Sequence, residues 1–489
     1  MAHVGISNGG EMNQVHMSGV SMYSEEFLTK LSAIEVAKGI ETRVVEPIRY
    51  IDCLLRRLEE TASLGGLISI QADELRRASA DLDSIYATPR SPLRAIPLII
   101  KDNIDVAGMV TTAGSAALRG VIATRNAPLV DRLLSAGALV LGKASMHEFA
   151  VGITNNNGSF GPARNPIDPT RIPGGSSGGC ATVIASFAAP AGIGTDTGGS
   201  IRIPAALCGI VGFRPSVGRW PAQGTVPISQ TMDTAGPMAR TVADCALLDA
   251  VVSSDDQELR DVPLASLRIG VPRKHFWHDL DAEMLSAGEE VLTLLRQHGV
   301  TLVECDVAGV AELSAGSKQV ALFELLPAVK EYFRIHGLPF EPQEFLSLVG
   351  SPDVRATFEL LMTNSPVTQA SYEHAINVLR PGLQYAYASC FSDHRLDAIL
   401  FPTTPLAATL IGEDETVTLN GRQAPTFPTF VRNTSPSAFA GLPGISLPMR
   451  RTKAGLPQGI ELDGAFGSDR HLLAVANSVE AMLRRLVAA

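Results

Sequence analysis

The chain has 489 residues, and its apolar content of 45%, with 18% charged residues, is typical of a folded globular protein. That apolar content excludes a largely disordered chain, despite the presence of 44 glycines and 31 prolines. The formal net charge of −10 gives no support for binding to nucleic acid or to an anionic membrane.

The sequence also lacks the usual marks of export and membrane insertion. Residues 1–20 have neither the basic start nor the apolar run of a signal peptide, and no apolar stretch approaches about 18 residues. The six cysteines are scattered without a C-x-x-C pair, which favours reduced thiols over a disulfide framework or a zinc site. We therefore expect a cytoplasmic protein without a bound metal.

The first part of the chain alternates between helical and strand patterns. Residues 1–24 are expected to form a loose leader, and residues 25–489 one continuous domain. In chain order we expect helices over 25–60 and 73–86, a buried strand over 95–100 that ends at Lys101, a helix over 129–136 and a buried strand over 138–143. Strands that alternate with helices predict an α/β fold, with helices covering a largely parallel or mixed sheet.

The second part begins with an unusual segment. Residues 152–204 are dense in Gly, Ser, Thr, Asn and Pro although they lie between apolar elements, and such loops inside a compact domain are usually functional. Residues 259–385 are expected to be a helical region that shapes a pocket. The remaining expected elements are helices over 281–298 and 372–387, strands over 396–402, 441–448 and 459–463, and a closing helix over 470–486.

Two glycine–serine segments carry the chemistry. Residues 173–179 (PGGSSGG) run into an apolar, helix-compatible stretch, so that backbone N–H groups and the positive end of a helix would lie beside Ser176. Taken alone, this segment is equally consistent with a glycine-rich helix entry that serves as a phosphate cradle. The absence of G-x-x-x-x-G-K-[ST] excludes the loop that binds nucleoside triphosphates.

The second segment, residues 194–204 (GTDTGGSIRIP), places Ser200 directly after two glycines. Glycines allow successive N–H groups to converge into a concave nest, which is the geometry that stabilises a developing oxyanion. A tight turn into a helix would explain this segment alone, but it does not explain two glycine–serine clusters so close together. We therefore expect the Ser200 hydroxyl to lie beside an oxyanion hole.

Two other catalytic motifs match by chance. Residues 174–178 fit the G-x-S-x-G nucleophile elbow, but the downstream His394 and His471 lie in no glycine-flanked loop that resembles a catalytic one. Residues 196–198 fit the D-[ST]-G signature of aspartic proteases, but no second copy supplies the required partner carboxylate.

A lysine is the alternative base. Lys101 ends a buried apolar strand, where a charged amine is poorly solvated, and desolvation lowers the pKa of a lysine. A single lysine after a strand is more often a surface residue, so the prediction depends on its combination with the two serine segments.

That combination resembles the amidase signature family. Lys101 and the two segments occur in the order and at the spacing of that family, and the match covers most of the chain. The resemblance extends to GKASMHEF at 142–149, FGPARNP at 160–166, FRP at 213–215 and FPTTP at 401–405. It implies a single α/β/α domain around a twisted mixed sheet, with no metal or organic cofactor.

The resemblance also implies roles for individual residues. Ser200 would be the nucleophile, Ser176 the relay after a cis peptide bond from Gly175, and Lys101 the base, with an acyl-enzyme on Ser200. The implied oxyanion hole consists of the N–H groups of Thr197, Gly198, Gly199 and Ser200. The implied pocket residues are Val151, Gly152, Gly175 and Thr195, with residues 300–385 forming the far wall.

Several motifs resemble the indoleacetamide hydrolase and mandelamide hydrolase branch of that family, namely RIP at 171–173, VPIS at 226–229, LDG at 462–464 and GSD at 467–469. They imply a primary arylacetamide substrate, although Cys180 departs from the small residue common in that branch. The alternatives are an aryl acylamidase or carbamate hydrolase with the same triad, and a glutamine-hydrolysing subunit of a tRNA amidotransferase. The expected partner is a small-molecule amide, and the expected oligomer is a homodimer.

Overall fold

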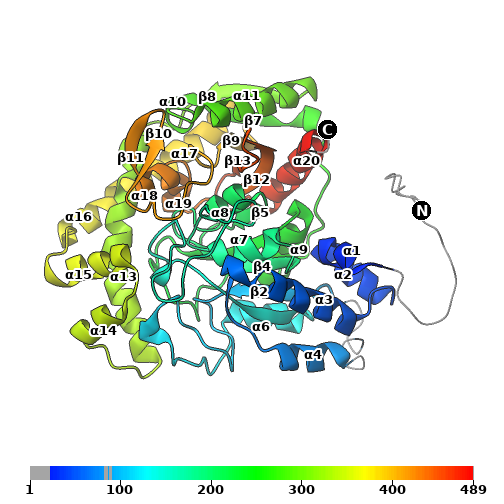
Figure 1. Ribbon diagram of the computed structural model, residues 1–489. Coiled ribbons are helices and arrows are strands. Elements are labelled where there is room, and N and C mark those ends of the chain that lie inside the picture. The colour runs from blue at the N-terminus through cyan, green and yellow to red at the C-terminus, as the bar shows by residue number, and fades with distance from the viewer. Residues whose placement is uncertain (1–22, 82–85, 87–90, 488–489) are drawn as a thin grey trace.

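A mixed sheet of 11 strands runs through the centre of the computed structural model, which describes residues 23–81, 86 and 91–487 (Figure 1). The strand order across the sheet is β1 (Leu67–Ser69), β3 (Leu139–Ala144), β2 (Pro97–Lys101), β4 (Ala191–Asp196), β6 (Thr234–Ala239), β5 (Val211–Arg214), β12 (Gly444–Arg451), β13 (Pro457–Asp463), β9 (Ala398–Pro402), β7 (Arg268–Pro272) and β8 (Thr301–Cys305). A separate hairpin pairs β10 (Thr416–Leu419) with β11 (Arg422–Pro425).

Helices cover both faces of this sheet, because apolar side chains point alternately to the two faces along the strands and both faces must be buried. In β2, Leu98 and Ile100 belong to one hydrophobic cluster, whereas Ile99 between them belongs to another. The first cluster includes residues of α6 (Pro128–Ser135), α9 (Val242–Ser253), α11 (Ala282–Gln297), α17 (Arg380–His394) and α20 (Asp469–Val487). The second includes residues of α3 (Pro47–Glu60), α4 (Ala72–Ala80), α7 (Gly178–Ala185) and α8 (Arg202–Cys208). The fold is therefore the expected single α/β domain.

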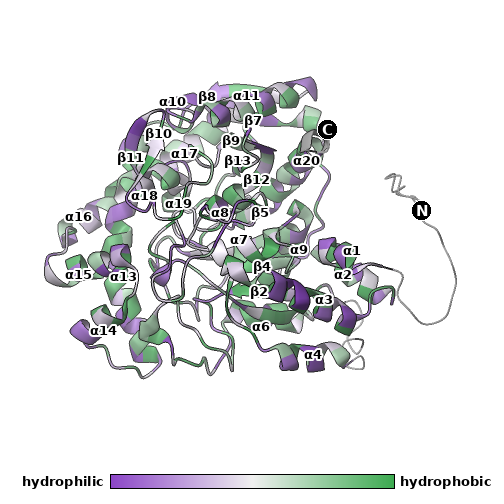
Figure 2. Cartoon of the chain, in the orientation of Figure 1, coloured by the Kyte–Doolittle hydropathy of each residue, from purple (hydrophilic) through white to green (hydrophobic). Residues whose placement is uncertain are grey.

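The remaining helices extend this body. They are α1 (Glu25–Lys30), α2 (Ala33–Glu41), α10 (Arg273–Phe276), α12 (Val310–Ser314), α13 (Gly316–Ile335), α14 (Pro342–Leu348), α15 (Pro352–Thr363), α16 (Gln369–His374), α18 (Thr426–Val431) and α19 (Ser435–Ala440). Figure 2 shows that hydrophilic and hydrophobic residues are mixed along these helices. Within the described ranges, no helix is both long and apolar enough to cross a bilayer.

Most of the expected elements are present, with shifted ends. The helical region expected over residues 25–60 is divided into three helices. Ser24 and Ser32 cap the starts of α1 and α2, and Pro47 is the first residue of α3. Almost all of the expected leader, residues 1–22, lies outside the described residues. The region 259–385 contains the parallel strands β7 and β8 as well as helices.

Strand β4 was not expected, because its sequence AGIGTD looks like a loop. The structure explains both of its inner glycines. A Cβ at Gly192 would lie 2.4 Å from Cγ2 of Ile99 in β2, and a Cβ at Gly194 would lie 2.8 Å from the Ser177 hydroxyl. These glycines therefore permit close packing of a buried strand and do not mark a turn.

An aromatic cluster attaches α13, α14 and α15 to the body. Phe149 contacts Phe345 of α14 and Phe358 of α15, with ring centroids 5.4 and 5.3 Å apart, and all three side chains are buried. Figure 1 shows these three helices together at one side of the molecule, away from α1 to α4. Aromatic burial thus positions a helical layer beside the loops that follow the central strands.

We expect Phe358→Ala to lower the free energy of unfolding by about 3–5 kcal/mol, because the substitution leaves a cavity among packed rings. Urea denaturation followed by circular dichroism measures the change. The control is Leu360→Ala in the same helix, where the side chain is 44% exposed and the cost should be below about 1 kcal/mol. Equal costs for the two variants would show that the cluster does not anchor the layer.

Candidate active site

Strand β2 carries Lys101 to the centre of the molecule. All five residues of β2 are buried, and the strand pairs in parallel with β3 on one side and β4 on the other. Lys101 is the last residue of β2, and its side chain is fully buried. Its Nζ lies 2.8 Å from the Ser176 hydroxyl oxygen and 2.7 Å from the Thr195 hydroxyl oxygen.

The surroundings of Lys101 favour an uncharged amine. Burial lowers the pKa of Lys101 to about 7, against weaker opposing effects of Cys180, Asp196 and Asp233. No carboxylate of the described residues forms an ion pair with this amine. A neutral amine can accept a hydrogen bond as well as donate one, and its two hydroxyl neighbours here are Ser176 and Thr195.

A second buried lysine shows the contrast. Lys143, in the neighbouring strand β3, is also fully buried, but its Nζ lies 3.1 Å from the carboxylate of Asp102. It also donates to the carbonyl of Val110 at 2.8 Å. Lys143 thus has the charged partner that Lys101 lacks, which gives the two neighbouring lysines different chemistry.

The two serine segments lie side by side at the end of β4. The peptide bond from Gly175 to Ser176 is cis, as the family resemblance implied. The next residue, Ser177, donates its N–H to the Ser200 carbonyl at 3.1 Å and its hydroxyl to the Thr195 carbonyl at 3.1 Å. Ser177 therefore holds Ser176, which contacts Lys101, next to the segment that carries Ser200. No hydrogen bond from another described residue occupies the Ser200 hydroxyl, and that residue is 7% exposed.

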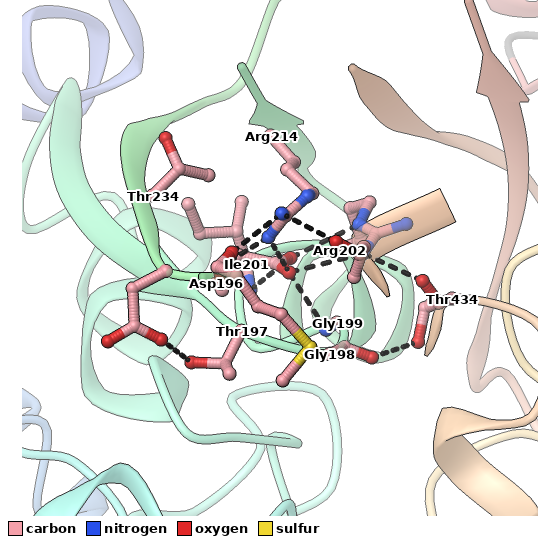
Figure 3. Close-up of polar contacts among 12 residues, drawn as sticks. Asp196, Thr197, Gly198, Gly199, Ile201, Arg202, Arg214, Thr234 and Thr434 are labelled. Atoms are coloured by element: carbon pink, nitrogen blue, oxygen red, sulfur yellow. Dashed lines mark hydrogen bonds and ion pairs between the residues drawn. The ribbon is translucent and has the colours of Figure 1, made fainter. Parts of the chain in front are cut away.

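Residues 196–199 form a loop that is held by buried charges (Figure 3). The carboxylate of Asp196 accepts from Nε and Nη2 of Arg202, both at 3.1 Å, and from Nη1 of Arg214 at 2.9 Å. Burial raises the pKa of Asp196, but the guanidinium groups of Arg202 and Arg214 outweigh this effect. The pKa of Asp196 is therefore well below its usual range. Asp196 is thus a permanent anion that fixes the loop between β4 and α8.

The loop leaves three of the four expected oxyanion donors free. The N–H of Gly199 donates to the Asp196 carboxylate at 2.9 Å, so that this donor is already used. The N–H groups of Thr197, Gly198 and Ser200 have no acceptor among the described residues. The Gly198 carbonyl accepts a hydrogen bond from the Thr434 hydroxyl at 2.5 Å, which holds this peptide group in place (Figure 3).

An acid pair lies behind Arg202. Its Nη1 contacts Glu461 at 2.5 Å and lies 4.0 Å from the Asp463 carboxylate. Burial raises the pKa of Asp463 to about 6 and that of Glu461 well above its usual value, while Arg202 opposes both shifts. The buried cluster contains the two guanidinium groups of Arg202 and Arg214 and three carboxyl groups. The cluster is electrically neutral when one of the three carboxyl groups is protonated.

A cavity of about 1040 Å³ opens beside this site. Thr195 and Thr197 form part of its wall, so the cavity begins next to the hydroxyl that contacts Lys101. Residues of α13 and the residues after it also line the cavity, and they belong to the region 300–385 that is expected to form the far wall of a substrate pocket. The apolar lining residues are Val121, Ile122, Ala150, Ala222, Val226, Pro227, Ile228, Ala235, Ala328, Ile335 and Leu338.

The roles of the other expected pocket residues stay predictions, because the described lining of the cavity does not include Lys101, Ser176 or Ser200. Val151, Gly152 and Gly175 are not among the described residues that line this cavity. Gly152 instead makes room for a neighbouring ring, because a Cβ there would lie 2.2 Å from Nε2 of His147. Sequence reasoning also missed Asn103, which donates to the Thr195 hydroxyl at 3.2 Å. Its position two residues after Lys101 was the only available signal.

Known proteins resemble this chain over most of its length. The sequence profile of the Amidase family matches residues 49–473. An indoleacetamide hydrolase of Agrobacterium vitis is 43% identical over 434 residues, which cover 88% of this chain and 93% of that protein. A mandelamide hydrolase of Pseudomonas putida is 36% identical over 479 residues, which cover 94% of this chain and 93% of that protein.

The fold comparison gives the same result. A crystal structure of an amidase superposes with a TM-score of 0.83 at 31% identity, over 93% of this chain and 100% of that chain. The matched region contains the sheet, both glycine–serine segments and Lys101. The chain therefore belongs to the amidase family, the amidase signature enzymes, and is an amide-hydrolysing enzyme.

Proposed function

We propose that this enzyme hydrolyses a primary arylacetamide to the aryl acetic acid and ammonia, through an acyl-enzyme on Ser200. The contact that carries the proposal is the 2.8 Å distance between the buried Lys101 amine and the Ser176 hydroxyl, on a segment joined to Ser200 through Ser177. Burial favours the neutral form of this amine, as a general base at neutral pH requires.

The proposed reaction begins with a proton relay. Ser176 gives its proton to the Lys101 amine and takes the proton of Ser200 as the Ser200 oxygen attacks the acyl carbon. The negative charge that develops on the acyl oxygen is stabilised by the free N–H groups of Thr197, Gly198 and Ser200. The relay then runs in reverse, so that the leaving nitrogen receives a proton and the C–N bond breaks.

Water completes the cycle by the same route. A water molecule gives a proton to the relay and attacks the acyl carbon, the Ser200 oxygen takes the proton back, and the acid leaves. The overall reaction consumes one water molecule and forms one carboxylic acid and one ammonia. Every proton transferred in these steps passes between the substrate or water, Ser200, Ser176 and Lys101.

The arylacetamide part of the proposal is supported by the cavity and by the named relatives. The cavity lining contains the apolar residues named above beside polar and charged ones, and Thr195 and Thr197 form part of its wall. The two relatives are named for indoleacetamide and mandelamide, both of which are primary amides with an aromatic ring near the amide. Apolar walls favour burial of such a ring.

We expect Ser200→Ala to reduce kcat at least about 10³-fold while leaving the fold unchanged, because the substitution removes the proposed nucleophile. Release of ammonia from indole-3-acetamide measures activity, and circular dichroism checks the fold. Ser266→Ala, at an exposed position, is the matched control and should retain normal activity. A Ser200→Ala enzyme that still turned over at a comparable rate would refute the nucleophile assignment.

The pH dependence should identify the base. We expect kcat/KM to rise with pH through about 7 and then level off, because Lys101 accepts a proton only in its neutral form and burial lowers its pKa to about 7. Lys101→Arg, which stays cationic, should lose at least about 100-fold in kcat/KM across the whole pH range.

Lys274→Arg is the control for this substitution, because the Lys274 side chain is 85% exposed. It should keep both the rate and the pH profile of the unmodified enzyme. If kcat/KM of Lys101→Arg still rose with pH through about 7, another group would cause that rise. The assignment of Lys101 as the base would then be wrong.

The substrate class can be tested by comparing amides. We expect kcat/KM for indole-3-acetamide and mandelamide to exceed that for acetamide by roughly 10- to 100-fold, which corresponds to burial of one aromatic ring. A 4-nitroanilide and an aryl carbamate serve as comparison substrates. Faster turnover of either one would favour the aryl acylamidase or carbamate hydrolase alternative.

A further inference from the structure

One carboxylate joins the oxyanion loop to the wall of the cavity. Asp233 lies immediately before β6, and its Oδ1 accepts from the Thr197 hydroxyl at 2.5 Å. Its Oδ2 accepts from the N–H groups of Ile228 and Ser229 at 2.8 and 2.9 Å. Asp233, Thr197, Ile228 and Ser229 all line the cavity. Both oxygens of a single side chain are thus used to connect two segments that would contact the substrate.

The bond to Thr197 has a mechanical consequence. Gly198 and Gly199 have no side chains, so Thr197 is the one residue between Asp196 and Ser200 that can be held through a side chain. Threonine is branched at Cβ and has few χ1 rotamers, so fixing its hydroxyl also restrains the backbone to which it is attached. The free N–H groups of Thr197 and Gly198 flank this restrained Cα, and they need a fixed direction in order to stabilise an oxyanion without reorganisation.

The wall segment is held independently from its other side. Glu324 of α13 accepts from the N–H of Thr231 at 3.1 Å and from the hydroxyl of Tyr372 at 2.8 Å. It also accepts from the hydroxyls of Ser229 and Thr231. Loss of Asp233 therefore leaves the wall attached to α13, whereas Thr197 loses the only hydrogen bond of its hydroxyl within the described residues.

We propose that Asp233 is a positioning residue for catalysis, which orients the Thr197 and Gly198 N–H groups through the Thr197 hydroxyl and ties them to the cavity wall at residues 226–231. The proposal rests on the proposed function, because it assumes that these N–H groups receive the negative charge of the acyl oxygen. Asp233 forms no hydrogen bond to Ser200 or Lys101 among the described residues, and its charge opposes the lowered pKa of Lys101 only weakly. Its contact with the oxyanion loop therefore passes through Thr197.

A double-mutant cycle tests this link. Thr197→Val removes the hydroxyl and keeps the shape, and it should lower kcat on indole-3-acetamide about 10- to 100-fold with KM changed less than about 3-fold. Asp233→Ala should lower kcat at least as much. In the double variant, Thr197→Val should cost less than about 2-fold beyond Asp233→Ala, because the bond is already lost. Independent, multiplicative effects of the two substitutions would overturn the proposal.

Two further variants separate positioning from general support of the fold. Asp233→Asn should recover kcat to within about 5-fold of the unmodified enzyme, since the Asn oxygen accepts from Ile228 and Ser229 while its amide group donates to Thr197. Thr363→Val, which removes an exposed hydroxyl from α15, is the matched control and should change nothing.

The outcomes also distinguish this proposal from the proposed function. If Asp233→Ala does not fold, Thr197→Val alone tests the proposal, and a Thr197→Val enzyme that changes KM without changing kcat overturns the positioning role. Full activity of Ser200→Ala would remove the proposed function itself. An inactive Ser200→Ala together with multiplicative effects at residues 197 and 233 would remove only the role of Asp233.

Discussion

The burial of one amine without a carboxylate partner is the constraint on which the rest of the site depends. Lys101 lies in the interior of the protein because β2 is buried from end to end and ends at this residue. Water is excluded there, so the charged form of the amine is unfavourable and hydroxyl groups are its nearest partners. Lys143, one strand away, has an ion pair and shows how the same fold would otherwise neutralise a buried lysine.

A glycine-rich loop becomes a rigid catalytic element only if something else fixes it. Here the fixing groups are charged and lie behind the loop, where Asp196 is bound by Arg202 and Arg214. Such buried ion pairs cost desolvation energy, and removing one partner leaves an unpaired charge. Their benefit in this enzyme is geometric. They hold the loop so that three N–H groups remain free beside Ser200, while the fourth is used to bind Asp196.

The cavity joins parts of the chain that are far apart in sequence. Its inner wall follows β4 and β6, whereas its outer wall is α13, which the aromatic cluster around Phe149 holds in place. Two carboxylates connect these walls. Asp233 accepts a hydrogen bond from Thr197 on the inner side, and Glu324 of α13 accepts one from Thr231. The proposed oxyanion loop and the cavity wall therefore belong to one connected set of hydrogen bonds.

Local patterns in the sequence determined much of this picture. The apolar run before Lys101 predicts a buried strand with a desolvated amine at its end, and the two glycine–serine segments predict converging N–H groups, because both properties depend on neighbours in the chain. The family resemblance extended these patterns to the α/β fold and to roles for Ser176 and Ser200. The elements with regular apolar spacing, such as β2, β3, β9 and α20, were also predictable for this reason.

Other features were decided only by the tertiary structure. Strand β4 looks like a loop until β2 and α7 pack against its glycines, and Gly199 counts as a free donor until Asp196 turns back to accept its N–H. Asp233 and Glu324 carry no local signal, because Thr197 and Thr231, which they bind, are distant from them in the sequence. Contacts between distant segments depend on how whole layers pack, and a linear pattern does not contain that information.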